Sequence, residues 1–165
     1  PRRRAAVSDV TIRGVHARAE QLIASLQLTP HPEGGWYRQV WKSTERVTRR
    51  HDGADRSAMT TIYFLLVEGT ESAPHVVQSD EVWHFYEGDP LELIAGDERV
   101  ILDADHRAHV IPARVWQRAR PLGAYTLVGC TVGPGFDFAD FSFLRDEPDS
   151  LARLRGVDPA LAALA

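Results

Sequence analysis

The first patterned part of the chain has a helical period. In residues 16–28, HARAEQLIASLQL, apolar side chains recur at positions that share one face of a helix, namely Ala19, Leu22, Ile23 and Leu26. The sequence TPHPEGG then ends the pattern, and its two glycines are free to adopt the positive φ that a tight turn requires. We therefore expect an amphipathic helix at residues 16–28 that packs on the rest of the domain.

After this turn the pattern changes to short runs of β-branched and aromatic residues, separated by turn residues. The runs are WYRQVW, TTIYFLLV, HVV, EVWHFYE, PLELIA, RVILD, AHVIPA, VWQRARPL, AYTLVGCTV and FDFADFSFL. Because no helical segment separates successive strands, an antiparallel sandwich or barrel is favoured over alternating βαβ units. The sequence predicts an all-β core at about 28–144, with the helix at 16–28 before it and short helices in a tail at about 149–165.

Residues 42–58, KSTERVTRRHDGADRSA, form the longest polar stretch and show no apolar period. Such a segment is typical of a mobile, solvated loop between strands. The functional alternative is a lid whose arginines meet an anionic ligand such as a phosphate or carboxylate.

Composition narrows the class of protein. A chain of 165 residues that is 44% hydrophobic and 25% charged fits one globular domain, residues 1–165. The net charge of −4 and the lack of a basic run with aromatics argue against a nucleic-acid partner. No apolar run approaches the roughly 20 residues that span a bilayer, so we expect no membrane partner and a cytoplasmic protein. Cys130 is the only cysteine, which excludes an internal disulfide and indicates a buried, inert thiol.

The stretch GTESAPHVVQSDEVWHFYEG, residues 69–88, gathers polar side chains suited to chemistry. The period of two in a strand places Glu81 and Trp83 on one face and His84 on the other. A four-residue turn, VQSD, would return the second strand beside the first, so that His75 and Glu81 converge. We therefore expect His75 and Glu81 in one pocket and His84 on the opposite face.

These residue types suit proton transfer. A histidine in a cleft can abstract a proton near neutral pH, and a nearby carboxylate can fix its tautomer. We expect His75 to be the base, Glu81 to orient it, and Tyr63, in TTIYFLLV, to be the proton donor. Further substrate contacts are expected from a cation, two aromatic rings and an amide, namely Arg38, Trp83, Trp116 and Gln117. The structural alternatives are a histidine bonded to a strand carbonyl and tryptophans that only pack in the core.

The spacing of the stretch from residue 69 to 88 resembles the first motif of the cupin superfamily. Its matching positions are Gly69, His75, Glu81 and Gly88, with Val77 where the motif has a second histidine. VIPARVWQ is similar to the second motif, with Pro112 at its proline, Arg114 at its glycine and Gln117 at its metal-binding histidine. HPEGGWYR, SDEVWHFYEGDPLEL and VGCTVGPGFDFADF, within residues 28–144, resemble one cupin subfamily long carried as a domain of unknown function.

The resemblance implies a jelly-roll barrel, or double-stranded β-helix, of two antiparallel sheets with a ligand pocket in its mouth. It also implies a homodimer. Cupins include metal-dependent oxygenases, isomerases, lyases and sugar-binding domains, so the fold alone does not give the reaction. The subfamily is similar to deoxysugar-nucleotide epimerases, which use a histidine base from the equivalent region and no metal.

The interpretation we favour is a small-molecule enzyme of the epimerase or isomerase type. It would act on a sugar, nucleotide-sugar or keto substrate through proton transfer by His75. One alternative is a non-catalytic cupin that binds a small ligand. Another is a metal-dependent oxygenase or lyase that holds Zn, Fe, Mn or Ni through a set made of His75, Glu81, His84 and Gln117. Because valine donates nothing and an amide is a weak donor, a tightly bound metal is not favoured.

Overall fold

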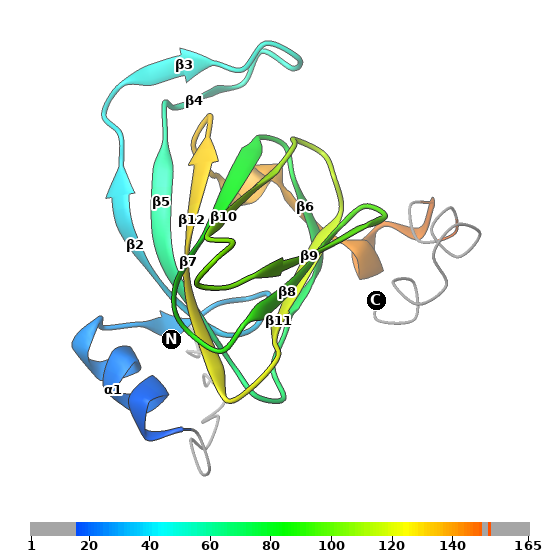
Figure 1. Cartoon of the computed structure of the whole chain (residues 1–165). Coiled ribbons are helices and arrows are strands. Elements are labelled where there is room, and N and C mark those ends of the chain that lie inside the picture. The colour runs from blue at the N-terminus through cyan, green and yellow to red at the C-terminus, as the bar shows by residue number, and fades with distance from the viewer. Residues whose placement is uncertain (1–15, 150–151, 153–165) are drawn as a thin grey trace, which may run out of the picture.

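Alternating inward and outward side chains build two antiparallel sheets that face each other. The computed structural model describes residues 16–149 and residue 152. Within them, one sheet has the order β1 (Thr29–Pro30), β2 (Trp36–Lys42), β5 (Thr60–Val67), β12 (Tyr125–Gly133), β7 (Asp80–Gly88) and β10 (Ala108–Ile111). The other has the order β13 (Phe141–Phe143), β6 (Ser72–Val77), β11 (Gln117–Pro121), β8 (Leu91–Ala95) and β9 (Glu98–Leu102). Figure 1 shows the two sheets curving around a common interior, which confirms the predicted all-β jelly roll.

The space between the sheets holds the main core. Phe64, Trp83 and Phe85 are buried there with leucines and valines from both sheets. Along β7 the side chains of Glu81, Trp83 and Phe85 are buried, whereas Tyr86 is exposed. The period of two predicted for this strand is therefore confirmed, and it aims Glu81 into the barrel.

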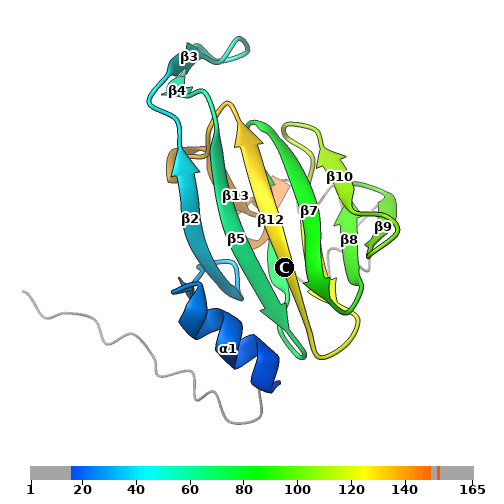
Figure 2. The ribbon, with the colours of Figure 1, turned by 60° about the vertical axis from the view of Figure 1, so that its left-hand side comes forward.

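The N-terminal helix α1 (Ala17–Ser25) covers the outer face of the first sheet, at the lower ends of its strands in Figure 2. It buries Ala19 and Leu22 against Trp36, Leu65 and Leu127, which form a second apolar cluster. The helix was predicted to extend to residue 28, but it ends at Ser25. Gln27 adopts a φ of 54° in the left-handed region, which stops the helical path.

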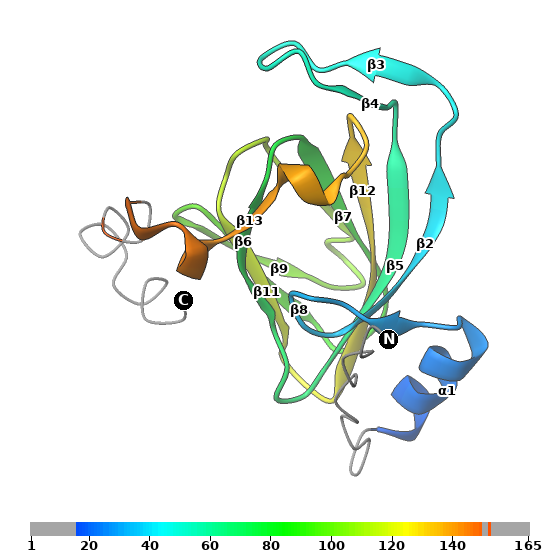
Figure 3. The same cartoon turned by 180° about the vertical axis from the view of Figure 1, so that it is seen from behind.

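Two further differences concern the segments next to the barrel mouth. The polar stretch at 42–58, predicted to be a loop, contains the hairpin of β3 (Arg46–Thr48) and β4 (Asp55–Ser57). Figures 1 and 3 show this hairpin as an arm above the barrel. The run 136–144 was predicted to be a strand, but only β13 is extended; 3-10 turns η1 (Phe138–Asp140) and η2 (Leu144–Asp146) flank it. Asp137 caps η1 by accepting a hydrogen bond from the Ala139 amide, which interrupts the extended backbone.

The helices expected at 149–165 lie outside the described residues, apart from residues 149 and 152. Within the described part of the chain, no helix is long and apolar enough to cross a membrane.

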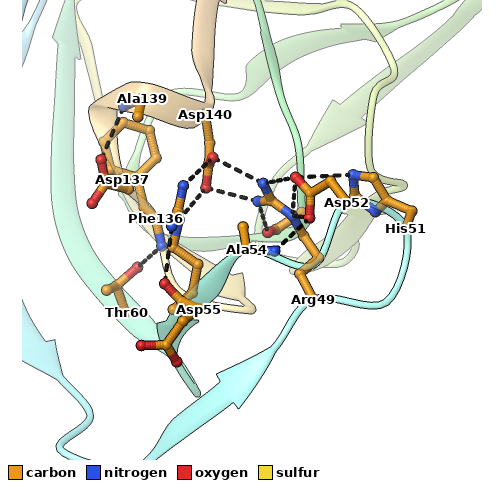
Figure 4. A network of polar contacts seen from close by, with 12 residues as sticks. Arg49, His51, Asp52, Ala54, Asp55, Thr60, Phe136, Asp137, Ala139 and Asp140 are labelled. Carbon is orange, nitrogen blue, oxygen red and sulfur yellow. Dashed lines mark hydrogen bonds and ion pairs between the residues drawn. The ribbon is translucent and has the colours of Figure 1, made fainter.

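The arm is fastened to the segment after β12 by a buried ion-pair cluster, shown in Figure 4. The Arg49 guanidinium donates to both carboxylate oxygens of Asp140, at 2.7 and 2.9 Å, and Arg56 does the same at 2.8 and 2.7 Å. Asp52 also accepts from Arg49, at 3.0 Å. Arg49 and Arg56 therefore bind the chain's own carboxylates, whereas the lid alternative expected arginines of this stretch to meet an anionic ligand.

Asp140 is 4% exposed, yet it stays ionised at neutral pH. Burial alone raises the pKa of this carboxyl, but the hydrogen bonds from Arg56 and Arg49 outweigh burial and lower the pKa to about 2. Because the folded-state pKa lies below the ordinary value of 3.8, the contribution of Asp140 to stability is complete above pH 3.8 and lost as the pH falls towards 2.

We predict that Asp140→Asn lowers the free energy of unfolding by about 3 kcal/mol, because it removes the buried counter-ion that Arg49 and Arg56 share and leaves Arg49 paired only with the partly exposed Asp52. Urea unfolding at neutral pH measures the change. Asp55→Asn is the matched control: this aspartate pairs with Arg46 at the surface, where ion pairs contribute little. Equal losses in the two variants would contradict the prediction.

Candidate functional site

A cavity of about 310 Å³ lies between the two sheets, at the end of the barrel that carries the arm. Its walls come from the first sheet, from the second sheet and from the segment after β12. The lining residues from β2, β5, β7 and β12 include Tyr37, Gln39, Thr60, Ile62, Glu81, Cys130 and Val132. Those from elsewhere are His31, Glu33, His75, Val77, Phe136, Phe138 and Phe141. The cavity is thus lined by apolar and aromatic side chains, with a few polar groups among them, as is usual for small-molecule sites.

The turn between β1 and β2 brings two polar side chains to this cavity. The backbone carbonyl of Glu33 accepts a hydrogen bond from the Ala73 amide at 2.7 Å, which docks the turn against β6. Gly34 has a φ of 113°, and a Cβ there would lie 2.2 Å from the carbonyl oxygen of Glu71. Only glycine fits this close approach. The HPEGG sequence therefore places His31 and Glu33 at the cavity.

His75 is buried, with 2% of its surface exposed, and its ring stacks on Phe141 at 5.2 Å between centroids. Its Nδ1 lies 2.8 Å from the backbone carbonyl oxygen of Ala73. Because a carbonyl oxygen only accepts, this contact assigns the ring proton to Nδ1. Nε2 makes no hydrogen bond with the described residues, and it is left as the lone-pair nitrogen of a ring that lines the cavity.

A carboxyl that the sequence did not single out stands beside His75. Glu33 Oε2 lies 3.2 Å from His75 Nδ1, and Glu33 Oε1 lies 3.7 Å from His31 Nδ1. Burial raises the pKa of Glu33 to about 8. Burial lowers the pKa of His75, and it lowers that of His31 to about 4. At neutral pH both rings are therefore uncharged, and Glu33 holds its proton.

Glu81 enters the cavity from β7 and is held by an amide from the facing sheet. Gln117 Nε2 donates to Glu81 Oε2 at 2.6 Å, while Gln117 Oε1 accepts from the Trp83 indole at 2.9 Å. Burial raises the pKa of Glu81 to about 7, although the nearby His75 opposes the rise. The Cys130 thiol lines the same cavity, and burial raises its pKa well above the ordinary value. Cys130 is thus buried and protonated, as predicted.

The structure brings His75 and Glu81 to one cavity, but by a different route from the one expected. The VQSD turn was predicted to pair their strands side by side. Instead β6 lies in one sheet and β7 in the other, so the chain crosses the barrel between them. The two side chains therefore meet across the barrel interior.

Two predicted site residues lie on the other face of the first sheet. Tyr63 was expected as a proton donor, but Ile62 and Phe64 beside it point into the barrel, and Tyr63 packs with the outer cluster under α1. Arg38 was expected to clamp an anion, but its guanidinium lies over the Tyr63 ring, 5.7 Å from the centroid. The alternation of β2 and β5 accounts for both errors, because it places Tyr37 and Ile62 inward.

The remaining predicted contacts are structural in this fold. Trp83 is buried within the core, and its ring is not among the residues that line the cavity. Gln117 does not line the cavity and instead fixes Glu81. Trp116 is half-buried and outside the lining, where its carbonyl accepts from the Gly96 amide. His84 points away from Glu81 on β7, as predicted.

The donors at the cupin ligand positions do not fit a tightly held metal. Val77 lines the cavity with methyl groups, the amide oxygen of Gln117 is occupied by Trp83, and His84 lies on the outer face. Within residues 16–149, no group of three or more His, Cys, Asp or Glu side chains is arranged to hold a metal ion. That the cavity works without a tightly bound metal stays a prediction, testable by elemental analysis of the purified protein.

Sequence reasoning missed His31, Glu33 and Tyr37, because HPEGG and the strand after it were interpreted only as a turn and a core strand. The sequence did contain a signal for these residues. The motif combines a histidine and a glutamate with two adjacent glycines, and glycines allow a turn to pack closely against a neighbouring strand. The run FDFADFSFL, predicted only as a strand, also supplies Phe136 and Phe138 to the cavity wall.

Comparisons with known proteins agree with this fold. The sequence model of the family Cupin_5, described as "Cupin superfamily (DUF985)", matches residues 20–144. A hypothetical protein from Leishmania major is 32% identical, with a TM-score of 0.79, and the match covers 88% of this chain and 96% of that one. A protein from Shewanella oneidensis is 28% identical, with a TM-score of 0.74, and the match covers 89% and 96% of the two chains.

A more distant structure shows the same fold. It is a cupin 2 conserved barrel domain protein from Rhodopseudomonas palustris, 17% identical, with a TM-score of 0.54 and coverage of 82% of this chain and 96% of that one. A comparison with curated protein sequences found no match.

We predict that the free energy of unfolding falls as the pH rises from 6.5 to 8. The folded-state pKa values of Glu33 and Glu81, about 8 and about 7, exceed the ordinary 4.5, so the folded chain keeps protons that the unfolded chain releases. This stabilisation is complete below pH 4.5 and lost as the pH passes through 7 and 8. The lowered pKa values of His31 and His75 make the free energy of unfolding rise with pH, but only below pH 6.5.

Urea unfolding at the two pH values measures this slope, which we expect to be of the order of 1 kcal/mol per pH unit. Glu33→Gln and Glu81→Gln should each flatten it. Glu98→Gln, which changes an exposed glutamate on β9, is the control and should leave it unchanged. A slope that persists in both cavity variants would show that other groups cause it.

Proposed function

Because the chain belongs to the DUF985 family of the cupin superfamily, we propose that it is a small-molecule enzyme of the epimerase or isomerase type. In this proposal His75 and Glu81 move a proton on a sugar or keto substrate that binds in the cavity between the sheets. The single observation that carries the proposal is the tautomer of His75: its proton is held by the Ala73 carbonyl, and Nε2 is left with a lone pair.

A neutral imidazole with a free lone pair is a suitable general base. Burial lowers the pKa of His75, so the ring is unprotonated at neutral pH before substrate binds. Glu33, which lies 3.2 Å from Nδ1, takes the orienting position that was predicted for Glu81.

Glu81 supplies the second proton-transfer group. Its pKa of about 7 means that both its acid and its carboxylate forms are populated near neutral pH, so it can donate a proton as well as accept one. His75 and Glu81 come from facing sheets. A substrate between them can lose a proton from one side and receive one from the other, which is what inversion at a carbon requires.

The proposed step balances within the site. His75 Nε2 takes the proton from the carbon next to the carbonyl, and the electron pair of that C–H bond moves into a new C=C bond while the carbonyl oxygen becomes an enolate. Glu33, protonated at neutral pH, and the Tyr37 hydroxyl are two donors of the cavity lining that can stabilise this oxygen. Glu81 then returns a proton to carbon, and exchange with solvent resets both groups.

The second candidate function is a non-catalytic module that binds a small ligand. The aromatic wall of Phe136, Phe138 and Phe141 favours it, because these rings supply binding surface without any chemistry. Such a module would keep its affinity for ligand when the lone pair of His75 is removed.

We predict that the protein catalyses hydrogen–deuterium exchange at the carbon next to a carbonyl. The experiment incubates a panel of small ketoses, aldoses and keto compounds with the protein in D₂O and follows loss of the proton signal by NMR. We expect His75→Asn to slow exchange about 100-fold or more, because general bases contribute 10² to 10⁴. His84→Asn, which changes a histidine on the outer face of β7, is the matched control and should exchange at the normal rate.

Exchange that is equally fast in His75→Asn would refute the proposed base. Binding of a panel compound without exchange, seen as a raised melting temperature, would instead support the binding module. Exchange that disappears with a chelator and returns with one metal would support the metal-dependent alternative.

A further inference from the structure

Within the part of the chain that the structure describes, the cavity contains acidic side chains but no basic side chain that is charged at neutral pH. Two carboxyls, Glu33 and Glu81, line it, each less than 10% exposed. None of the described lining residues is a lysine or an arginine. Arg49 and Arg56, in the arm next to the mouth, are paired with Asp140, and Arg38 lies on the outer face of the sheet. An anionic ligand would therefore lose its hydration without gaining a fixed cation as a partner.

The two histidines of the cavity do not replace the missing cation. Burial lowers the pKa values of His31 and His75, so both rings are neutral near pH 7. In turn, neither Glu33 nor Glu81 has a permanent positive partner, which is why burial raises the pKa values of both. A positively charged group inside the cavity would supply the counter-ion that each carboxylate lacks.

The aromatic walls point to the same kind of ligand. Tyr37, Phe136, Phe138 and Phe141 all line the cavity, and the faces of such rings attract cations. Phe138 is 55% exposed, so core packing does not account for its place at the cavity. Its ring stacks with that of His31 at 6.3 Å, which holds it beside Glu33. His75 Nε2, without a hydrogen-bond partner among the described residues, adds an acceptor that an ammonium N–H can use.

The size of the cavity limits the ligand. At about 310 Å³ it lies at the lower end of the range for small-molecule sites, roughly 300 to 1,000 Å³. This volume suits a monosaccharide or a smaller keto compound. A nucleotide sugar is much larger and carries phosphates that would need cations, so both size and charge count against it.

We propose that the substrate class of this site is a small sugar or ketone that carries a protonated amine, such as an amino sugar or an α-amino ketone. The ammonium group lies between the carboxyls of Glu33 and Glu81 and against the aromatic wall. This inference rests on the proposed function for the identity of the site and names its substrate class. It concerns binding, so it can be tested apart from the chemistry.

The test measures binding by calorimetry, below neutral pH, for two sets of compounds that share a skeleton and differ in charge. One set is glucosamine, glucose and glucuronate; the other is aminoacetone, hydroxyacetone and pyruvate. We expect the cationic member to bind most tightly in at least one set, by about 10-fold or more over the anionic member. Binding of the amine should also release protons to the buffer, because a carboxyl of the cavity ionises beside the ammonium group.

The double variant Glu33→Gln and Glu81→Gln tests the assigned residues. We expect it to reduce the preference for the amine to within about 2-fold, with the melting temperature as the check that it folds. If the double variant does not fold, Glu33→Gln alone should still halve the proton release or abolish it. Glu98→Gln, at an exposed site on β9, is the matched control and should keep the full preference.

Several outcomes would overturn the inference: equal or tighter binding of the anion, no preference for the amine in either set, or a preference that survives the double variant. These outcomes are distinct from failure of the proposed function. If neutral sugars exchange deuterium and no preference for the amine is found, the enzyme proposal holds and this inference is wrong. An amine preference without exchange leaves this inference standing and the enzyme proposal wrong.

Discussion

The face-to-face packing of two sheets is the constraint on which the rest of this structure depends. Each sheet has an apolar inner face that must be buried, and Phe64, Trp83 and their neighbours fill most of the space between the sheets. Towards the arm the filling is incomplete, and a cavity remains. Side chains that point into this cavity come from both sheets. They lose their hydration on folding, and few charged partners replace it. Their altered pKa values follow from that burial.

The chemistry of the site results from how its buried groups are paired. Among the described residues, His75 has a hydrogen-bond partner on one nitrogen only, and Glu81 has an amide rather than a cation as its partner. A fully paired set of the same residues would be inert, because its protons and lone pairs would be occupied. The contrast with Asp140 is instructive: two arginines hold that carboxylate in its charged form, and it serves the fold alone.

The local pattern of apolar and polar residues predicted the fold well, but it predicted the candidate site only in part. Strand period placed Glu81 inward and His84 outward, and it did so correctly because alternation is a property of the strand itself. It could not show that β6 and β7 belong to different sheets, since pairing is decided by the whole barrel. The same limit explains Tyr63, whose face depends on the register of β5, and Glu33, which reaches His75 through a turn about 40 residues earlier in the chain.

The cluster around Asp140 has a consequence for the order in which the molecule folds. Arg49 and Asp140 are 91 residues apart in the sequence, and strands β4 to β12 lie between them. Closing so long a loop is entropically costly until the intervening sheets have formed. The wall that carries Phe136 and Phe138 is therefore completed late, after the barrel exists. The sheets can therefore pair before the arm docks, whereas the cavity gains its full wall only when Arg49 and Asp140 meet.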